Sequence, residues 1–363
     1  MLKNYETWNE YCDRLVQRNK AVSMPILMCF ELTSNCNLCC SMCYVRLQSK
    51  QIGKQLLTGD TWLELARKAE ASGVLKIMVS GGEAVTHPDF RTIYEGLISL
   101  GFLVELRSNG YLLNDDFVRW ISPRKPHTLS VTIYGASDDT YKKVCGISDG
   151  FTRVTQNIEK LITAGIHVKT SMTVIRDNEC DYYAVKAWAE ERRIPFSSSW
   201  YLISPFENTG RSTDDLWPAL WEKEWTAEDE IPVDNGIPES EAEKCFFEVC
   251  RLNGAQFTIT WDGKMTPCTG IRYIEEDALN QPLDVAFSKM KEKMQAVRRP
   301  KKCIHCKYRR YCKVCPSSGP LVNGEIQINR NYCLKAKSLY MRYHAQENSE
   351  TKNETVEGKV DCP

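Results

Sequence analysis

The sequence predicts an α/β protein in which six strand-helix units form a partial (βα)6 barrel, followed by a small cysteine-rich domain. Between about residues 25 and 204, short apolar runs rich in Val, Ile and Leu alternate with longer segments of helical period, the pattern of repeated βα units. Most of the 17 cysteines in the 363-residue chain lie near residue 40 or beyond residue 244. A chain of this length predicts one large domain or two of moderate size.

Each expected element is predicted by its local pattern. The strands are short apolar runs over residues 25–32, 75–80, 103–107, 128–133, 166–175 and 195–203. The helices cover residues 60–71, 89–100, 114–121, 137–164 with a break around 146–150, and 179–192. Asp60 and Ser137 are expected caps, because short polar side chains accept hydrogen bonds from free N–H groups of a first turn. We expect the chemistry at the carboxyl ends of the strands.

Composition excludes several classes of protein. The 47 Lys and Arg balance 47 Asp and Glu, with a pI near 6.9, so nucleic-acid binding through bulk charge is not expected. Neither a run of about 18 apolar residues nor a secretory signal is present, which predicts no membrane span and a cytoplasmic protein. An odd cysteine count without an export signal favours metal or redox chemistry over a disulfide framework.

Five segments are expected along the chain. They are an N-terminal helical segment (1–24), the barrel (25–204), an acidic connector (205–244), the cysteine-rich domain (245–340) and a polar tail (341–363). Between residues 211 and 244, eleven Asp and Glu stand against three Lys and Arg. A solvated connector accounts for this bias, and an acidic rim that attracts a basic substrate segment is the alternative.

The first cysteine cluster comes directly after the first expected strand. Cys36, Cys40 and Cys43 have the spacing CxxxCxxC, and three thiolates on one loop can hold three corners of a [4Fe-4S] cluster and leave the fourth iron open. A zinc site and buried unpaired thiols are the alternatives. A structural zinc site usually has four protein ligands, and no nearby His completes one.

This loop resembles the signature of the radical S-adenosylmethionine (SAM) superfamily. The resemblance implies a TIM-like partial barrel in which Cys36, Cys40 and Cys43 hold a [4Fe-4S] cluster and Cys39 does not. It also implies that the open iron chelates SAM, which is cleaved reductively to a 5′-deoxyadenosyl radical that abstracts a substrate hydrogen. Met42 stands where the family commonly has an aromatic residue near the adenine, and Tyr44 lies two positions further on.

Two further motifs match the family in order. Ser80-Gly81-Gly82-Glu83 resembles its GGE motif, in which glycine admits the methionine moiety of SAM and the carboxylate, here Glu83, accepts a hydrogen bond from its ammonium group. Ser108 and Asn109 after the third strand, and Thr132 on the fourth, occupy positions of ribose and polar SAM contacts. A turn residue or a strand hydroxyl accounts for these three residues equally well.

The second cysteine region offers eight thiols. An expected hairpin over residues 257–267, turning at Asp262-Gly263, would present Cys268. Spacing alone leaves zinc and iron-sulfur sites open. The cysteine order resembles the SPASM domain of radical SAM enzymes, which implies two auxiliary [4Fe-4S] clusters. The first would use Cys245, Cys250, Cys268 and Cys315, and the second Cys303, Cys306, Cys312 and Cys333. Without Cys245, the first auxiliary cluster would have an open iron that could bind substrate.

The resemblance covers about residues 25–340 and implies an oxidoreductase-type radical SAM/SPASM enzyme. Sequences similar to residues 131–137 and 201–205 are frequent in maturases of ribosomally made peptides, so a peptide or protein substrate is favoured, with a thioether or carbon-carbon link or a similar oxidation as product. Too few residues precede Pro25 for a leader-binding winged helix, so a separate leader-binding protein is expected unless the substrate lacks a leader. A flavodoxin or ferredoxin would supply electrons.

Two other functions stay open at this point. One is a radical dehydrogenase or epimerase acting on a sugar or aminocyclitol. The other is a non-catalytic scaffold whose cysteines bind zinc. The six cysteines outside the expected ligand sets are taken as ordinary thiols, although one of them could donate a hydrogen atom to a substrate radical: Cys12, Cys29, Cys39, Cys145, Cys180 and Cys362.

Overall fold

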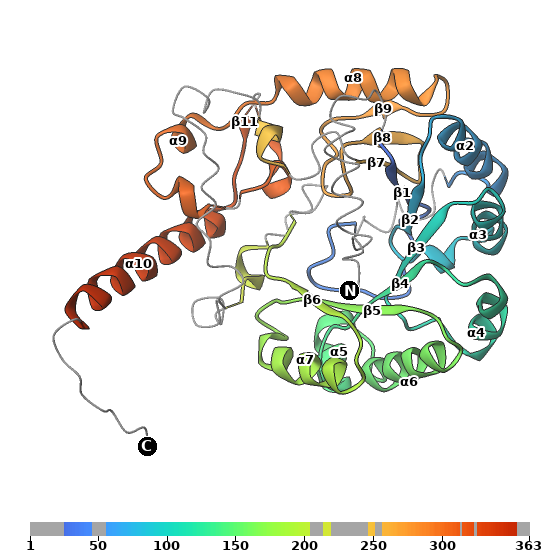
Figure 1. The fold of residues 1–363 in the computed structure, drawn as a ribbon, viewed down its shortest axis with the longest axis horizontal. Coiled ribbons are helices and arrows are strands. Elements are labelled where there is room, and N and C mark those ends of the chain that lie inside the picture. Colours follow the sequence, from blue (N-terminus) through green and yellow to red (C-terminus); the bar gives the residue numbers. More distant parts are fainter. Residues whose placement is uncertain are drawn as a thin grey trace, which may run out of the picture.

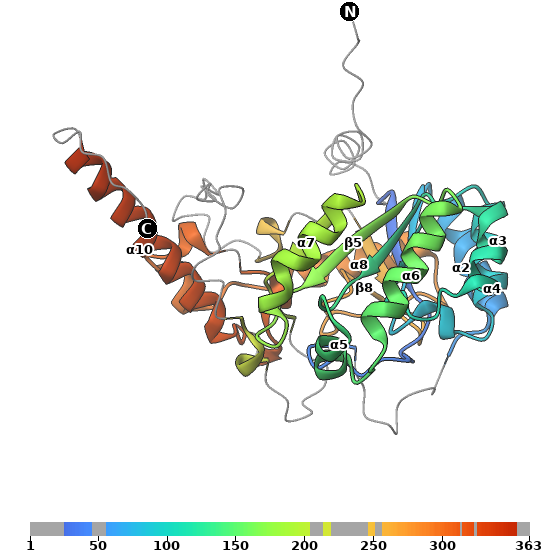
Figure 2. The same cartoon turned by 90° about the horizontal axis from the view of Figure 1, so that it is seen from below.

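A computed structural model describes residues 25–45, 56–203, 213–218, 246–250, 256–312, 314–322 and 325–353. In this part of the chain one curved sheet carries nine strands in the order β6-β5-β4-β3-β2-β1-β7-β8-β9. Helices cover its outer face, and α10 extends away from it (Figures 1 and 2). The expected segment 1–24, Cys245 and most of the connector 205–244 lie outside the described residues.

The first six strands confirm the predicted partial barrel. They are β1 (Leu27–Glu31), β2 (Lys76–Ser80), β3 (Leu103–Ser108), β4 (Thr128–Thr132), β5 (Val168–Thr173) and β6 (Phe196–Ser199). Each pairs in parallel with the next strand along the chain. Every connection therefore crosses the outer face of the sheet, as repeated βα units require.

In the part of the chain that the structure describes, six helices form the outer layer of the barrel. They are α2 (Gly59–Ala71), α3 (Phe90–Ser99), α4 (Asp115–Ile121), α5 (Asp138–Cys145), α6 (Gly150–Thr163) and α7 (Tyr182–Glu191). The Ser137 side chain caps α5, as predicted, and Gly146 ends this helix with φ at 78°. The Asp60 cap is wrong, because the Thr58 side chain accepts from the N–H of Thr61 and α2 begins one residue before Asp60.

The apolar core lies between the sheet and these helices. Phe30 of β1 packs against Trp62 of α2 with ring centroids 4.7 Å apart, and both side chains are buried. Along β5, Val168, Thr170 and Met172 are buried, whereas the alternate residues are partly exposed. Successive strand residues face opposite sides of a sheet, so the outer face of β5 joins the core and its inner face is left to a cavity.

The predicted hairpin forms, but it belongs to the same sheet as the barrel. β7 (Gln256–Ile259) and β8 (Lys264–Thr266) pair antiparallel around Gly263, whose φ is 78°. β7 also pairs in parallel with β1, and β9 (Glu276–Asp277) continues beyond β8. The C-terminal region is thus joined to the barrel through backbone hydrogen bonds.

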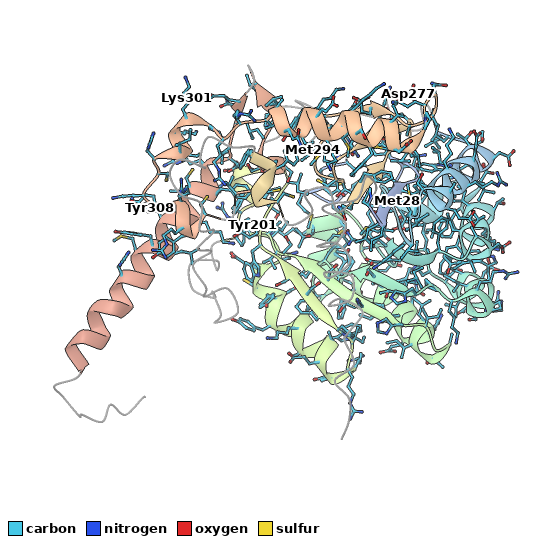
Figure 3. The ribbon with its side chains drawn as sticks, turned by 45° about the horizontal axis from the view of Figure 1, so that its top comes forward. Met28, Tyr201, Asp277, Met294, Lys301 and Tyr308 are labelled. Carbon is cyan, nitrogen blue, oxygen red and sulfur yellow. The ribbon has the colours of Figure 1, made fainter. Side chains whose placement is uncertain are left out.

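The remaining elements are short apart from two helices. They are α8 (Leu283–Ala296), α9 (Lys301–Ile304), β10 (Leu321–Val322), β11 (Glu325–Ile326) and α10 (Arg330–Asn353). Helix α10 continues past residue 340, the expected start of the polar tail. Tyr201, after β6, lies between the barrel and α10 (Figure 3), and its ring stacks on that of Tyr332 with centroids 5.5 Å apart. Among the described helices none combines the length and apolar character needed to cross a bilayer.

Candidate active site

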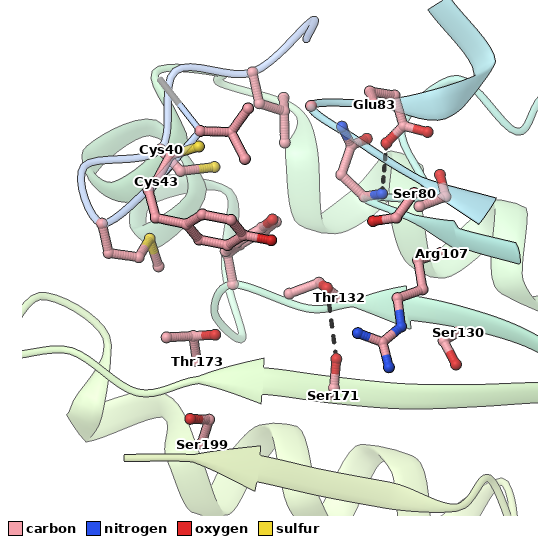
Figure 4. A pocket seen from close by; sticks show the side chains of 18 of the residues that line it. Cys40, Cys43, Ser80, Glu83, Arg107, Ser130, Thr132, Ser171, Thr173 and Ser199 are labelled. Atoms are coloured by element: carbon pink, nitrogen blue, oxygen red, sulfur yellow. Dashed lines mark hydrogen bonds between the residues drawn. The ribbon is translucent and has the colours of Figure 1, made fainter. Parts of the chain in front are cut away.

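A cavity of about 580 Å³ opens at the carboxyl ends of the strands. The last residue of each strand from β2 to β6 lines it, and these residues are Ser80, Ser108, Thr132, Thr173 and Ser199. The cysteine loop forms another part of its wall (Figure 4). All ten residues expected to hold the first cluster and SAM line this cavity: Cys36, Cys40, Cys43, Met42, Gly81, Gly82, Glu83, Ser108, Asn109 and Thr132.

The cysteine loop rests on the C-terminal end of α5. The N–H of Cys39 donates to the carbonyl of Cys145 at 3.0 Å, and the N–H of Ser41 donates to the carbonyl of Val144 at 2.9 Å. These contacts satisfy helix carbonyls that would otherwise lack a partner. Cys40 is buried and Cys39 is exposed, and Cys39 is absent from the cavity lining. Cys36 is exposed as well but lines the cavity together with Cys40 and Cys43, and the exclusion of Cys39 from the ligand set stays a prediction.

The glycines of the Gly81-Gly82-Glu83 motif let two backbone segments approach closely. The N–H of Gly82 donates to the carbonyl of Thr33 at 2.7 Å, and that of Glu83 to the carbonyl of Asn35 at 2.8 Å. A Cβ on Gly82 would lie 2.4 Å from the Asn35 oxygen. In the fold these glycines make room for the backbone that leads to Cys36, and the room that they were expected to make for SAM stays a prediction.

Glu83 is buried with one carboxylate oxygen unpaired. Its Oε2 accepts from the backbone N–H of Asn109 at 2.7 Å, and the Ser108 hydroxyl and the Val85 N–H also stabilise this carboxylate, whereas Oε1 has no partner within hydrogen-bond distance among the described residues. Burial raises the pKa of this carboxyl to about 7. A buried acceptor without a partner costs about 1–3 kcal/mol, so Oε1 fits a ligand that brings its own donor. An ammonium group is such a donor, and the residues present therefore fit SAM.

Asn109 connects Glu83 with the cysteine loop. Its side-chain amide donates to Oδ1 of Asn37 at 2.9 Å and approaches Sγ of Cys36 at 3.6 Å. Its Oδ1 accepts from the N–H of Tyr111 at 3.0 Å, which makes it a turn residue as well. Ser108 similarly accepts from the N–H of Gly110. Both residues therefore have the turn roles that the sequence left open, while they also line the cavity.

Sequence reasoning missed a polar inner wall of the barrel. Glu105 and Arg107 of β3, Ser130 of β4, and Lys169 and Ser171 of β5 all line the cavity. Closed barrels of this type are filled by branched apolar side chains. The missed signal was the alternation of polar residues within β3 and β5, because residues two apart on a strand share a face.

The two expected auxiliary cysteine sets each lie close together. Cys315 and Cys250 are near enough to Cys268 to raise the pKa of its thiol, although burial contributes most to its value of about 12. Burial likewise raises the pKa of Cys303 and that of Cys312 to about 11, and the nearby thiols of Cys333 and Cys306 add to this rise. Cys245, the fourth member of the first set, lies outside the described residues.

The donor chemistry of these sets suits a cluster with several irons. Over the described ranges, no three His, Cys, Asp or Glu side chains converge on one point as ligands of a single metal ion do. The thiolates of a cubane cluster bind different irons, so they do not need such convergence. The close grouping of the cysteines in each auxiliary set therefore supports, as a proposal, one four-thiolate iron-sulfur site per set.

The C-terminal region also touches the first cysteine loop. Tyr44, next to Cys43, shares a side-chain hydrogen bond with Thr269. Arg272 pairs with Glu31 at the end of β1, and the Glu31 side chain is fully buried. Burial raises the pKa of Glu31, and the guanidinium of Arg272 opposes that rise. The segment between β8 and β9 therefore holds both the last residue of β1 and the end of the cysteine loop.

Comparison with known proteins gives matches over most of the chain. The AdoMet-dependent heme synthase of Methanosarcina barkeri is 25% identical over 341 residues, which cover 85% of this chain and 96% of that protein. The sporulation killing factor maturation protein SkfB of Bacillus subtilis is 32% identical over 155 residues, covering 43% of this chain and 37% of SkfB.

The fold is similar to that of solved structures. Streptococcus suis SuiB bound to S-adenosylmethionine superimposes with a TM-score of 0.62 at 16% identity, covering 87% of this chain and 80% of SuiB. Residues 30–189 match the Radical SAM superfamily. This range contains the cysteine loop, Glu83, Asn109 and Thr132, which the fold brings to one cavity. Residues 30–189 therefore form a Radical SAM domain.

Proposed function

We propose that this chain is a radical SAM enzyme of the SPASM type that modifies a peptide or protein. One observation carries the proposal: the cavity gathers three thiols and the unpaired Oε1 of Glu83 at the strand ends. When bound, a [4Fe-4S] cluster and SAM supply reductive cleavage to a 5′-deoxyadenosyl radical, which can abstract a hydrogen from a substrate carbon.

Residues of the cavity wall would hold these two groups. Cys36, Cys40 and Cys43 ligate the cluster, and Glu83 accepts from the ammonium group of SAM. Asn109 fixes the Glu83 carboxylate by donating to Oε2. Four further residues of the wall would contact SAM, namely Gly81, Gly82, Ser108 and Thr132. Met42, which is buried beside the cluster cysteines, would pack on the adenine through its soft thioether.

The two C-terminal cysteine sets would hold auxiliary [4Fe-4S] clusters. Cys250, Cys268 and Cys315 would form the first site with Cys245, and Cys303, Cys306, Cys312 and Cys333 would form the second. These clusters would accept the electron left on the product radical or position the substrate. A flavodoxin or ferredoxin would deliver the electron for SAM cleavage, and a reducing compartment such as the cytoplasm would keep the clusters intact.

A peptide substrate is supported by the edge of the sheet. Strand β6 ends the sheet in the described part of the chain, and Ser197 and Ser199 on it are exposed and line the cavity. An extended peptide can pair with such an edge strand. SkfB is a maturation protein by name, and SuiB has been solved with its precursor peptide SuiA. A separate leader-binding protein would present the peptide, and the product would carry a thioether or carbon-carbon link or a similar oxidation.

A second candidate is an acid-bearing small molecule. The heme synthase aligns along 96% of its own length, whereas SkfB aligns along 37%. A tetrapyrrole is therefore a better small-molecule candidate than the sugar or aminocyclitol considered from sequence. The unpaired buried oxygen of Glu83 disfavours the zinc scaffold, because a scaffold has no need for an acceptor of the SAM ammonium group.

The test is anaerobic reconstitution with iron and sulfide, and then an assay for 5′-deoxyadenosine from SAM under reductant. We expect about twelve irons per chain, about four fewer in a Cys36/Cys40/Cys43→Ala variant together with loss of SAM cleavage, and about four fewer in Cys268→Ala. Cys180→Ala, which removes an exposed cysteine, is the matched control and should keep all irons.

The substrate is then sought by mass spectrometry. Short cysteine-containing peptides encoded beside this chain should lose two hydrogens per link in the presence of SAM and reductant. Conversion of a porphyrin instead would select the second candidate. A fully reconstituted protein that forms no 5′-deoxyadenosine would contradict the enzyme proposal itself.

A further inference from the structure

We propose that Arg107 and Lys169 form a carboxylate-binding subsite on the inner wall of the barrel and that the substrate carries the carboxylate. The inference rests on the proposed function, because it takes this cavity as the substrate site. It adds the chemical class of the group by which the substrate is held.

The two cations belong to one row across three neighbouring strands. Arg107 of β3 is in register with Ser130 of β4, and Ser130 is in register with Lys169 of β5. All three residues line the cavity. Adjacent strands lie about 4.8 Å apart, so the backbones of the two cationic residues are separated by roughly 10 Å with a hydroxyl between them. In Figure 4 the Arg107 guanidinium extends into the cavity beside Ser130 and Ser171.

The charges of this wall do not balance. Glu105 accepts from Nε of Arg107 at 3.2 Å and pairs with Nζ of Lys76 at 2.6 Å, so one carboxylate serves two cations. Lys169 has no carboxylate partner among the described residues. Within the lining of this wall, the two cations Arg107 and Lys169 therefore face one carboxylate, Glu105, which is also neutralised by Lys76 from outside the lining. The wall thus offers a net positive charge to a ligand.

Arg107 keeps part of its donor capacity. Its side chain is 49% exposed, whereas that of Glu105 is 11% exposed. Only Nε of Arg107 has a hydrogen-bond acceptor among the described residues. Both terminal nitrogens are thus available, and a guanidinium binds a carboxylate through two parallel N–H donors. This geometry suits a planar carboxylate.

Hydroxyl groups continue the polar wall beyond the cations. Thr132 is in register with Ser171, and Ser171 with Ser197 of β6. The Thr132 and Ser171 hydroxyls lie 3.5 Å apart. Small hydroxyl side chains leave room that branched apolar residues would fill in a packed barrel, and their O–H groups can donate to the second oxygen of a carboxylate.

The test uses the reconstituted full-length protein and small probes of matched shape. Saturation-transfer NMR would compare glutarate, a dicarboxylate, with its neutral diamide glutaramide. We expect the wild-type protein to bind glutarate in preference, and Arg107→Gln and Lys169→Gln to weaken glutarate binding by about tenfold each. Arg119→Gln is the matched control, because Arg119 is 71% exposed and lies on α4, and Arg107→Lys should keep part of the binding.

Each variant is also assayed for uncoupled SAM cleavage. Lost glutarate preference in Arg107→Gln, with both glutarate preference and 5′-deoxyadenosine formation retained in Arg119→Gln, supports the subsite. Equal binding of glutarate and glutaramide by the wild type, or unchanged binding in Arg107→Gln, overturns it while leaving the proposed function intact. Absence of SAM cleavage in the reconstituted wild type is instead a failure of the proposed function.

Competition identifies the source of the carboxylate. Acetyl-Gly-Glu-Gly-amide is compared with its glutamine counterpart, and protoporphyrin IX with its dimethyl ester, each against glutarate. Competition by the acidic peptide supports the subsite with a peptide substrate, and competition by the porphyrin alone supports it with the second candidate. Competition by neither overturns the assignment of this wall to a substrate carboxylate.

Discussion

The Sγ atoms of Cys40 and Cys145 lie 3.6 Å apart, and both cysteines are buried. Cys145 is the last residue of α5, and its carbonyl also accepts from the N–H of Cys39. The helix therefore supports the cysteine loop through its backbone and places a second thiol against one of the proposed cluster ligands. When the ligand is not bound to iron, it has a thiol partner within reach.

Oxidation of cluster-free protein is therefore expected to join Cys40 to Cys145. After treatment with diamide, which oxidises thiol pairs, peptide mass spectrometry should find this linked pair, and later reconstitution with iron should fail. Cys145→Ser should preserve reconstitution, whereas Cys180→Ser, at an exposed site, should behave as wild type. A link between Cys36 and Cys43 in place of this pair would contradict the expectation.

Glu83→Gln is expected to weaken SAM binding between about tenfold and a hundredfold, because a hydrogen bond to an ammonium loses its charge assistance. The amide oxygen can still accept from the N–H of Asn109, so the loop geometry should persist. Equilibrium binding of SAM to the reconstituted variant measures the effect. Glu105→Gln removes a carboxylate of the same wall and should change SAM affinity little, and unaltered affinity in Glu83→Gln would rule out the ammonium role.

The same carboxyl should make the stability of cluster-free protein depend on pH. Burial raises its pKa from the usual 4.5 to about 7, so the folded state holds this proton more tightly than the unfolded state. The stabilisation is complete below about pH 4.5 and is lost as pH rises through about 7. Thermal unfolding should show Glu83→Gln more stable than wild type at pH 8, by up to about 3 kcal/mol, and similar at pH 4.5. Equal stability of wild type and Glu83→Gln at pH 8 would show that burial of the ionised Glu83 carboxylate does not destabilise the fold.

Gly82→Ala should displace the backbone that leads to Cys36, because the new Cβ would lie 2.4 Å from the Asn35 oxygen. We expect a large loss of iron bound at the first cluster together with reduced stability. Gly101→Ala is the control, since its φ is 84° but no atom lies within 4 Å of the added Cβ. It should cost about 1 kcal/mol from backbone strain and keep its iron. Full iron content in Gly82→Ala would refute the role of this close approach.

Arg272→Met should destabilise the protein by about 3–5 kcal/mol, because it leaves the buried Glu31 carboxylate without its cation. Chemical denaturation measures this loss, and the double variant Glu31→Gln/Arg272→Met should recover part of it. Arg91→Met breaks an exposed ion pair with Asp116 and should cost less than about 1 kcal/mol. Equal effects of the two single substitutions would mean that burial of Glu31 is not decisive.

The sequence predicted the parallel strands and the residues that gather around the cavity, because both depend on local signals, while the roles of those residues stay predictions. Apolar runs such as 103–107 mark strands, and the Cys36 loop and Glu83 come after strand ends that must meet at one face of the barrel. The α2 cap was wrong because Thr58 and Asp60 are both good caps. A contact distant in sequence favours Thr58: Asp89 accepts from the N–H of Gly59 at 2.8 Å, and this bond holds the first residue of α2 directly after Thr58.

Two features were not predicted, because the polar alternation within β3 and β5 does not by itself say which face of a strand turns inward, and strand pairing over a long sequence distance has no local signal. The cationic wall depends on which face of β3 and β5 turns inward, and Arg107 and Lys169 look like surface residues in an isolated strand. The pairing of β7 with β1 joins residues more than 220 positions apart, such as Leu27 and Gln256. Backbone hydrogen bonds between strands do not require particular side chains, so the sequence does not indicate which distant strands pair.

That pairing limits how the protein can be divided. The strand leading into the cysteine loop has β2 on one side and β7 on the other, so a truncation before residue 256 would expose an unpaired strand edge next to the catalytic centre. A chimera that borrows the auxiliary cysteine region of a relative should keep this chain through Asp277 and exchange only the residues beyond it. Although the family match ends at residue 189, the smallest piece expected to fold on its own includes the strands up to β9.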